Sequence, residues 1–243
     1  MKKSRTFRAG TALVLLVIAA IIASAVFSQS KTGDTGDIDL LQNQELEAYF
    51  LSQKKAMDLE ANLDADTPIG SLYAGIAYAK AMGTSEDDAT KEAKDLLVED
   101  QAFLWYAEKE NFQVSESDLE AYMNKIISDA KKADNYPVVS ATCEKAGMTY
   151  DEFVKGNADA YKAAFIKDHF CTEEASAYSN THFNSSNEAF LDYWKTYKAD
   201  VIKQFKKSEN YLLLEKAVNN CVKQIQLNKL SVDELKAKDI FLK

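Results

Sequence analysis

The sequence predicts an all-α protein that follows a single N-terminal transmembrane or signal helix, and three observations support this fold class. Gly and Pro, which supply most turn chemistry, occur only 8 and 2 times in 243 residues, too few for a sheet with many hairpins. From Leu40 onward, apolar residues recur at spacings of three and four, as on one face of a helix. Ser or Thr followed three residues later by an acid recurs before apolar runs, which is typical of helix starts.

Residues 1–30 predict a signal peptide or a signal anchor. A long uncharged run follows four basic residues, Lys2, Lys3, Arg5 and Arg8. Its apolar part, residues 9–27, would span about 29 Å as a helix, which matches the hydrocarbon core of a bilayer. The basic residues would stay in the cytoplasm and the following chain would be exported. Residues 23–25 form a candidate cleavage site, so we expect either a single-pass cell-membrane protein with its C-terminal domain outside the cytoplasm, or a secreted one.

Residues 31–39 are small, polar and glycine-bearing and predict a linker, and residues 40–243 predict one helical domain. Its first helix is expected from Leu40 to about Asn62, because the following stretch contains Pro68. A short apolar helix over 71–82 should end at Gly83, since glycine readily adopts the left-handed conformation that follows a helix.

Capping signals predict where the remaining helices begin. Thr84 or Ser85 should start a helix that runs to about residue 111, and Pro137 opens a segment that ends at residue 147. Ser or Thr paired with an acid three residues on predicts three capping boxes: Ser115/Asp118, Thr149/Glu152 and Ser231/Glu234. The helix that begins at Thr149 is expected to reach residue 170. A long C-terminal helix should begin at Ser185 or Ser186 and extend to about residue 228.

The charge of the exported part excludes nucleic-acid binding. Both arginines lie before residue 9, and beyond them 25 Lys stand against 38 Asp and Glu, a formal charge of −13. Without guanidinium groups, and with a net negative field, this part of the chain repels polyanions. The three cysteines allow either one disulfide with a free thiol or three buried thiols: Cys143, Cys171 and Cys221.

No catalytic or metal constellation stands out in the sequence. Two S-x-x-K matches, at 52–55 and 128–131, lack the ordered partner motifs of penicillin-binding enzymes. Four residues that zinc favours have spacings unlike those of familiar zinc sites: Cys143, His169, Cys171 and His182. We therefore expect no metal and no cofactor, and we do not favour an enzyme.

Two stretches carry a family resemblance: "DLLVEDQAFLWYAEKENFQVSESDLEAYMNKI" (95–126) and "EKAGMTYDEFVKGNADAYKAAFI" (144–166). In order and spacing, these helix starts resemble the SurA-type N-terminal chaperone domain of exported peptidyl-prolyl isomerases of the SurA and PrsA kind. The resemblance covers residues 86–170. The sequence departs from the family at 62–70, where an apolar-Asn-Gly turn is expected. It also lacks Gly after residue 170, so we expect no glycine-rich catalytic parvulin domain in these residues.

The resemblance implies a chaperone-like holdase or foldase whose partners are unfolded or partly folded exported polypeptides, with membrane contact through residues 9–27. The chain has 26 aromatic residues, and several fall on more than one helix face, so some can line a client-binding surface. The candidates are Phe103, Trp105, Tyr106, Tyr122, Tyr193, Trp194 and Tyr197. Two alternatives stay open: a membrane-anchored envelope scaffold that docks one folded partner, and a peptidyl-prolyl isomerase.

Overall fold

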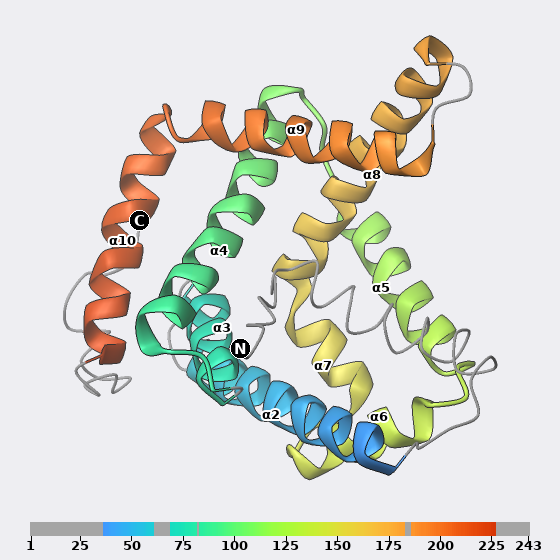
Figure 1. The fold of residues 1–243 in the computed structure, drawn as a ribbon, viewed down its shortest axis with the longest axis vertical. Helices are drawn as coiled ribbons and strands as arrows, with labels where there is room; N and C mark the ends of the chain where they lie inside the picture. Colours follow the sequence, from blue (N-terminus) through green and yellow to red (C-terminus); the bar gives the residue numbers. More distant parts are fainter. Residues whose placement is uncertain (1–35, 61–68, 82, 183–185, 227–243) are drawn as a thin grey trace, which may run out of the picture.

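The computed structural model describes residues 36–60, 69–81, 83–182 and 186–226 (Figure 1). These residues form nine helices and no strand, which confirms the predicted all-α class. The predicted signal segment and the predicted start at Ser231 lie outside the described residues. Among the described helices, none combines the length and the apolar content needed to cross a bilayer.

The helices follow the predicted order, with boundaries close to the capping signals. In chain order they are α2 (Gly36–Glu60), α3 (Ile69–Ala81), α4 (Glu86–Lys109), α5 (Glu116–Ala130), α6 (Tyr136–Lys145), α7 (Tyr150–Gly156), α8 (Ala158–Thr181), α9 (Asn187–Phe205) and α10 (Glu209–Gln226). The α2 helix begins inside the predicted linker. The predicted helix that opens near Pro137 corresponds to α6, with proline in its first turn as sequence statistics favour.

Four predicted helix starts are confirmed by side-chain hydrogen bonds. In each, the cap hydroxyl accepts from the backbone N–H three residues on, at 3.1–3.2 Å: Ser85, Ser115, Thr149 and Ser186. Thr149 forms the full capping box, because the Glu152 carboxylate accepts from the Thr149 N–H at 2.7 Å. At Ser115 the box is only half formed. Asp118 accepts from the Ser115 hydroxyl at 2.6 Å instead, since its side chain is one methylene shorter than that of Glu.

The predicted helix from Thr149 to residue 170 is wrong, because the structure divides it into α7 and α8 at Asn157. The backbone of Asn157 leaves the helical region (φ −108°), and its side-chain amide donates to the Phe153 carbonyl at 2.7 Å. Asn competes for backbone groups in this way, and the preceding Gly156 has a low helix propensity. The two residues together end α7.

The predicted long C-terminal helix is also wrong, because α9 ends at Phe205 and α10 begins at Glu209. Ser208 caps the second helix. Its hydroxyl donates to the Phe205 carbonyl at 2.7 Å and accepts from the Tyr211 N–H at 3.2 Å. The turn sends α10 back alongside α4, where the Lys94 ammonium donates to the Asn219 amide at 2.9 Å (Figure 1).

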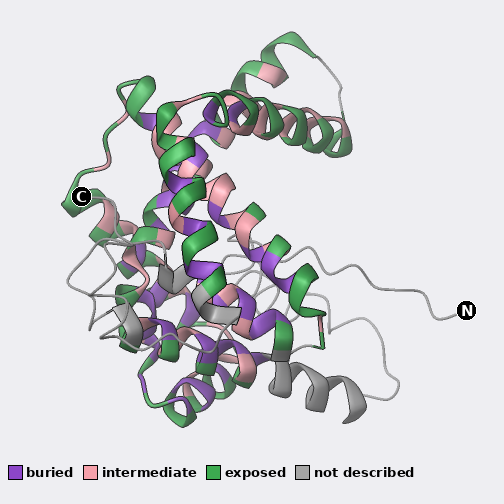
Figure 2. Cartoon of the chain, turned by 90° about the vertical axis from the view of Figure 1, so that its left-hand side faces the viewer, coloured by how far each residue is buried: buried purple, intermediate pink, exposed green. Residues whose placement is uncertain are grey.

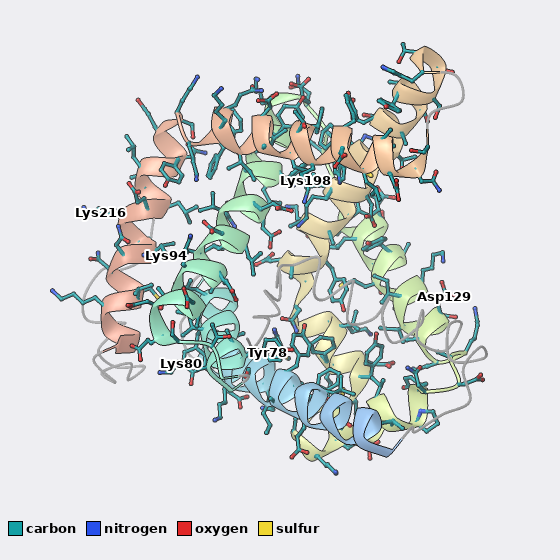
Figure 3. All side chains as sticks on the ribbon, in the orientation of Figure 1. Tyr78, Lys80, Lys94, Asp129, Lys198 and Lys216 are labelled. Atoms are coloured by element: carbon teal, nitrogen blue, oxygen red, sulfur yellow. The ribbon has the colours of Figure 1, made fainter. Side chains whose placement is uncertain are left out.

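The buried side chains form two apolar clusters rather than one central core, and Figure 2 shows buried residues on most helices. The first cluster joins α3, α4, α8, α9 and α10, and the second joins α2, α5, α6, α7 and the beginning of α8. The α3 helix contributes to both, since Leu72 lies in the first cluster and Tyr78, labelled in Figure 3, in the second. The α8 helix does the same through Phe170 and Tyr161.

All three cysteines are free thiols in the structure. This agrees with the predicted three thiols rather than with a disulfide, although only two of the three are buried. Cys143 and Cys221 are buried, one in each cluster, whereas Cys171 is only half-buried. Burial raises the pKa of both buried thiols to about 12.

Candidate functional site

The distal parts of α8 and α9 extend beyond the other described helices, and we call residues 171–182 and 186–196 the arm (Figures 1 and 2). No residue of the arm is buried, because each one is half-buried or exposed. The apolar stripe of a helix is normally covered by another element. Apart from Trp194, which packs against the first cluster, the aromatic side chains of the arm are therefore not packed into a core.

Aromatic rings form the contact between the two helices of the arm. The Tyr178 ring on α8 lies 5.8 Å from that of Phe190 and 4.9 Å from that of Tyr193, both on α9. It also stacks on the His182 ring at 4.2 Å. Each of these rings keeps part of its surface exposed, so the contact remains accessible from its edges.

A polar bond and an exposed leucine complete the arm. The Tyr193 hydroxyl donates to the Glu174 carboxylate, and this bond raises the pKa of Tyr193 above its ordinary value. Leu191 is 60% exposed, although it directly follows Phe190 and lies two residues before Tyr193 on α9. The arm thus presents aromatic and aliphatic surface beside carboxylates.

At its base the arm joins an aromatic seam, which we define as Phe103, Tyr106, Phe170, Trp194 and Tyr197. The Trp194 and Tyr197 rings stack at 5.3 Å on α9, and Trp194 lies 5.9 Å from Phe103 on α4. Tyr106 lies 5.1 Å from Phe170 on α8. Three helices therefore meet through rings of the kind predicted to bind clients.

A group of charges fixes the crossing of α9 over α4 and α8. Lys198, labelled in Figure 3, donates to the Glu99 carboxylate at 3.2 Å. Lys167 donates to Asp100 at 2.7 Å and lies 3.7 Å from Glu99. These side chains are largely shielded, with 11–27% exposure, so their attraction is screened less than that of surface pairs.

The structure brings four of the seven predicted client residues into the seam. Tyr106, Trp194 and Tyr197 are half-buried, so their edges are accessible. Phe103 is completely buried, with 0% exposure, and in this conformation it is a core residue out of reach of a client. Burial, together with a bond to Tyr106, raises the pKa of Tyr197.

The other three predicted residues lie apart from one another. Tyr193 is on the arm, as described above. Trp105 packs against Phe205 at 5.9 Å, and the Lys109 ammonium lies 5.6 Å from its ring centre, near the turn between α9 and α10. Tyr122 on α5 packs against Phe165 at 5.1 Å and donates to Asp168 at 2.8 Å.

Tyr178, Phe190 and Leu191 were missed as candidates, although one signal was available. Phe190 and Leu191 are adjacent, so a helix must place them on different faces, and one core cannot cover both. Tyr178 gave no comparable signal, because a single aromatic residue in a helix is most often buried.

A shallow hollow of about 530 Å³ runs along one side of α8 within the arm. Hydroxyl-bearing and small residues line it: Cys171, Thr172, Ala175, Ser176, Ser179 and Asn180. Sequence reasoning also missed this feature, since Ser and Thr in a helix carry no sign of the shape around them.

The residues considered for zinc lie in different places. Cys143 is buried in the second cluster, and His182 is at the end of α8. His169 stacks on Phe112 at 3.8 Å, and its Nε2 lies 3.3 Å from Glu173. Within the described residues no three His, Cys, Asp or Glu side chains are grouped so as to hold a metal ion.

Comparison of the chain with protein-family models, curated proteins and solved structures found no match. The resemblance to the SurA-type domain is therefore an expectation that comes from the sequence motifs alone.

Proposed function

We propose that the chain is a chaperone-like protein that binds extended apolar segments of unfolded or partly folded exported polypeptides on the arm. The observation that carries this proposal is the uncovered aromatic contact of Tyr178, Phe190 and Tyr193 with the exposed Leu191. Apolar surface that the fold does not cover is characteristic of interaction sites. Aromatic rings also supply a large contact area for few rotatable bonds.

An extended client suits the arm better than a deep ligand does. The arm offers ring edges and one shallow hollow, so it fits side chains that arrive in varied order rather than one fixed shape. The half-buried edges of Tyr106, Trp194 and Tyr197 continue this surface toward the body of the protein. The net negative charge of the chain favours solubility while apolar segments are bound.

The two tryptophans of the chain provide the test. Trp105→Phe leaves Trp194 as the single reporter at the base of the arm, and Trp194→Phe leaves Trp105 near the α9–α10 turn. The full chain, held in neutral-lipid nanodiscs, is titrated with a ten-residue peptide rich in Leu and Phe. A second peptide with Ser at those positions serves as its control. We expect a saturable change in Trp194 emission with the apolar peptide only, and a much smaller change in Trp105 emission.

Two leucines of similar exposure, one on the arm and one on α10, distinguish binding on the arm from non-specific apolar binding. Leu191→Ser should weaken peptide binding, whereas Leu212→Ser on α10 should not, although Leu191 and Leu212 are 60% and 64% exposed. The proposal is abandoned if a molar excess of the full chain leaves aggregation of an unfolded model client unchanged and Trp194 emission constant.

A second candidate function is the scaffold that docks one folded partner. Leu212 and Leu213 favour it, because they form an exposed apolar pair on α10, a helix whose opposite face is packed into the first cluster. A fixed patch on a packed helix suits a partner of one shape. Affinity capture that yields one stoichiometric partner, lost on Leu212→Ser, supports the scaffold, whereas a spread of exported proteins supports client binding.

A further inference from the structure

The hollow along α8 presents hydrogen-bond acceptors. The hydroxyls of Thr172, Ser176 and Ser179 donate to the carbonyls four residues earlier in the helix, at 2.8, 3.0 and 2.8 Å. A hydroxyl has one proton and two lone pairs. Because the helix carbonyls take the protons, these oxygens offer lone pairs to anything that enters the hollow.

The charges around the hollow also favour a hydrogen-bond donor, in particular a positively charged one. The exposed Asp168 lies one helical turn before Thr172 and is close enough to act on the neighbouring Cys171, where it adds to the effect of burial in raising the thiol pKa. Lys198 also acts on Cys171 and lowers this pKa, but its ammonium is bonded to Glu99. The arm as a whole carries four acids and one lysine, a net charge of −3 with His182 neutral.

We propose that this hollow binds Lys or Arg side chains of an extended polypeptide, so that the arm selects segments in which cationic and apolar residues alternate. The inference rests on the proposed function, because it names the class of segment that the same arm takes. Ammonium and guanidinium groups carry several donors and no acceptor, which complements a wall of hydroxyl lone pairs beside carboxylates.

The dimensions of an extended chain agree with this division of the arm. Alternate side chains of an extended chain point to opposite sides and repeat about every 6.8 Å. Thr172 and Ser176 are four residues apart, about 6 Å along a helix. A segment that lies along α8 can therefore place successive cations over the hollow while its apolar side chains face the rings of Tyr178 and Tyr193.

Three peptides of equal length test the inference on the full chain in neutral-lipid nanodiscs. Each alternates Leu or Phe with one other residue, which is Lys, Ser or Glu. Binding is measured from the anisotropy of a labelled peptide and from Trp194 emission in the Trp105→Phe variant. We expect the Lys peptide to bind at least about five-fold more tightly than the Ser peptide, and the Glu peptide most weakly. The difference should shrink at about 0.5 M NaCl, where the charges are screened.

Variants of the hollow identify the groups that bind the cation. The triple change Thr172→Val, Ser176→Ala and Ser179→Ala removes the acceptors and should bring the affinity for the Lys peptide close to that for the Ser peptide. Thr142→Val is the matched control and should leave it unchanged. Its hydroxyl also donates to a carbonyl four residues earlier, at 2.7 Å, but lies on α6, outside the arm. Ser176→Lys places a cation in the hollow and should abolish the preference for Lys even if the triple variant folds poorly.

The results separate the inference from the function on which it rests. Equal affinities for the three peptides, or a preference for Glu, overturn the inference and leave capture of apolar segments standing. An unchanged Lys preference in Ser176→Lys overturns it as well. If none of the three peptides binds, the proposed function fails first.

Discussion

The hydroxyl of Tyr197 donates to the hydroxyl of Tyr106 across 3.2 Å, and this bond joins α9 to α4 inside the aromatic seam. The two rings meet edge to face, with centres 6.2 Å apart and planes at 89°. The pair is thus a polar link within a contact that is otherwise apolar, and its loss can be measured without removing either ring.

Removing either hydroxyl of this pair should destabilise the protein slightly. We expect Tyr197→Phe and Tyr106→Phe each to lower the free energy of unfolding by about 1 kcal/mol, the usual net value of such a bond. The double variant should lose less than the sum, because both changes break the same bond. Urea denaturation of the four proteins measures the coupling, and strictly additive losses would contradict the prediction.

Tyr161 should behave in the opposite way, because its buried hydroxyl has no hydrogen-bond partner in the described part of the chain. We expect Tyr161→Phe to leave stability unchanged or to raise it by about 1 kcal/mol, since the change removes an unpaired polar group from the core. Tyr122→Phe is the matched control and should destabilise, because the Tyr122 hydroxyl is bonded to Asp168 at 2.8 Å. If Tyr161→Phe lowered the free energy of unfolding as much as Tyr122→Phe does, the result would contradict this prediction.

Alkaline pH should destabilise the fold. Burial raises the pKa of the Cys143 and Cys221 thiols to about 12 from an ordinary value of 9.0. Above about pH 9 the unfolded chain therefore loses these protons first, so stability is fully present below that pH and falls as pH rises toward 12. Buried tyrosines with raised pKa values add to the fall above about pH 10: Tyr49, Tyr150 and Tyr161.

The measurement is the free energy of unfolding at intervals from pH 7.5 to 10.5. Cys221→Ala should flatten the fall between pH 9 and 10.5, because one raised thiol has been removed. Cys171→Ala should flatten it less, since this thiol is only half-buried. A free energy that stays constant or rises over the range would contradict the sign of the argument.

A side chain at Gly156 should require the Met57 side chain to shift. A Cβ at this position would lie 2.0 Å from the Met57 methyl carbon and 3.0 Å from its sulfur, which accepts from the Asn157 amide at 3.8 Å. The nearest atoms belong to the end of a flexible, half-exposed side chain that can shift, so we expect Gly156→Ala to cost no more than about 1 kcal/mol, partly offset by the better helix propensity of Ala. In the Met57→Ala background the same change should cost much less. Thermal unfolding of the two single variants and the double variant decides, and an equal cost in both backgrounds would contradict the contact.

Glu99 should matter more than a carboxylate of a surface pair, because two lysines lie against it at the crossing of α9. Glu99→Gln leaves Lys198 and Lys167 with less compensation in a largely shielded place, and we expect a loss of about 1–2 kcal/mol. Asp129→Asn, which breaks exposed pairs with lysines on and next to α5, should cost far less. Urea denaturation at low and high salt makes the comparison. Similar losses for the two variants would argue that the crossing is held by apolar contacts alone.

Helix caps, which depend on local hydrogen bonds, could be predicted well from the sequence. Ser85, Ser115, Thr149 and Ser186 cap helices as expected, because a cap depends only on residues three or four apart. The breaks at Asn157 and Ser208 were missed, since Asn or Ser within a helical pattern is tolerated in many helices. What decides them is a side-chain bond to a nearby carbonyl, at Phe153 and Phe205.

The candidate site was less predictable than the fold. Aromatic spacing identified residues that meet in the seam, but it gave no reason to separate the buried Phe103 from the accessible Trp194. That difference depends on the crossing of α9 over α4, which involves residues about 90 positions apart. The arm was not predicted either. Beyond Phe170, α8 carries one large apolar side chain, Tyr178, which indicates that this part of the helix is less covered but does not indicate that α9 packs beside it.

The continuity of α8 has a mechanical consequence. This one helix of 24 residues, about 36 Å long, is anchored by Tyr161 in the second cluster and by Phe170 in the first, and its free end forms half of the arm. The helix is therefore a stiff rod that is held at two points. If the arm binds a polypeptide as we propose, a load applied at this free end would be transmitted along the helix to both anchoring points, so tension on the bound chain would act on both clusters.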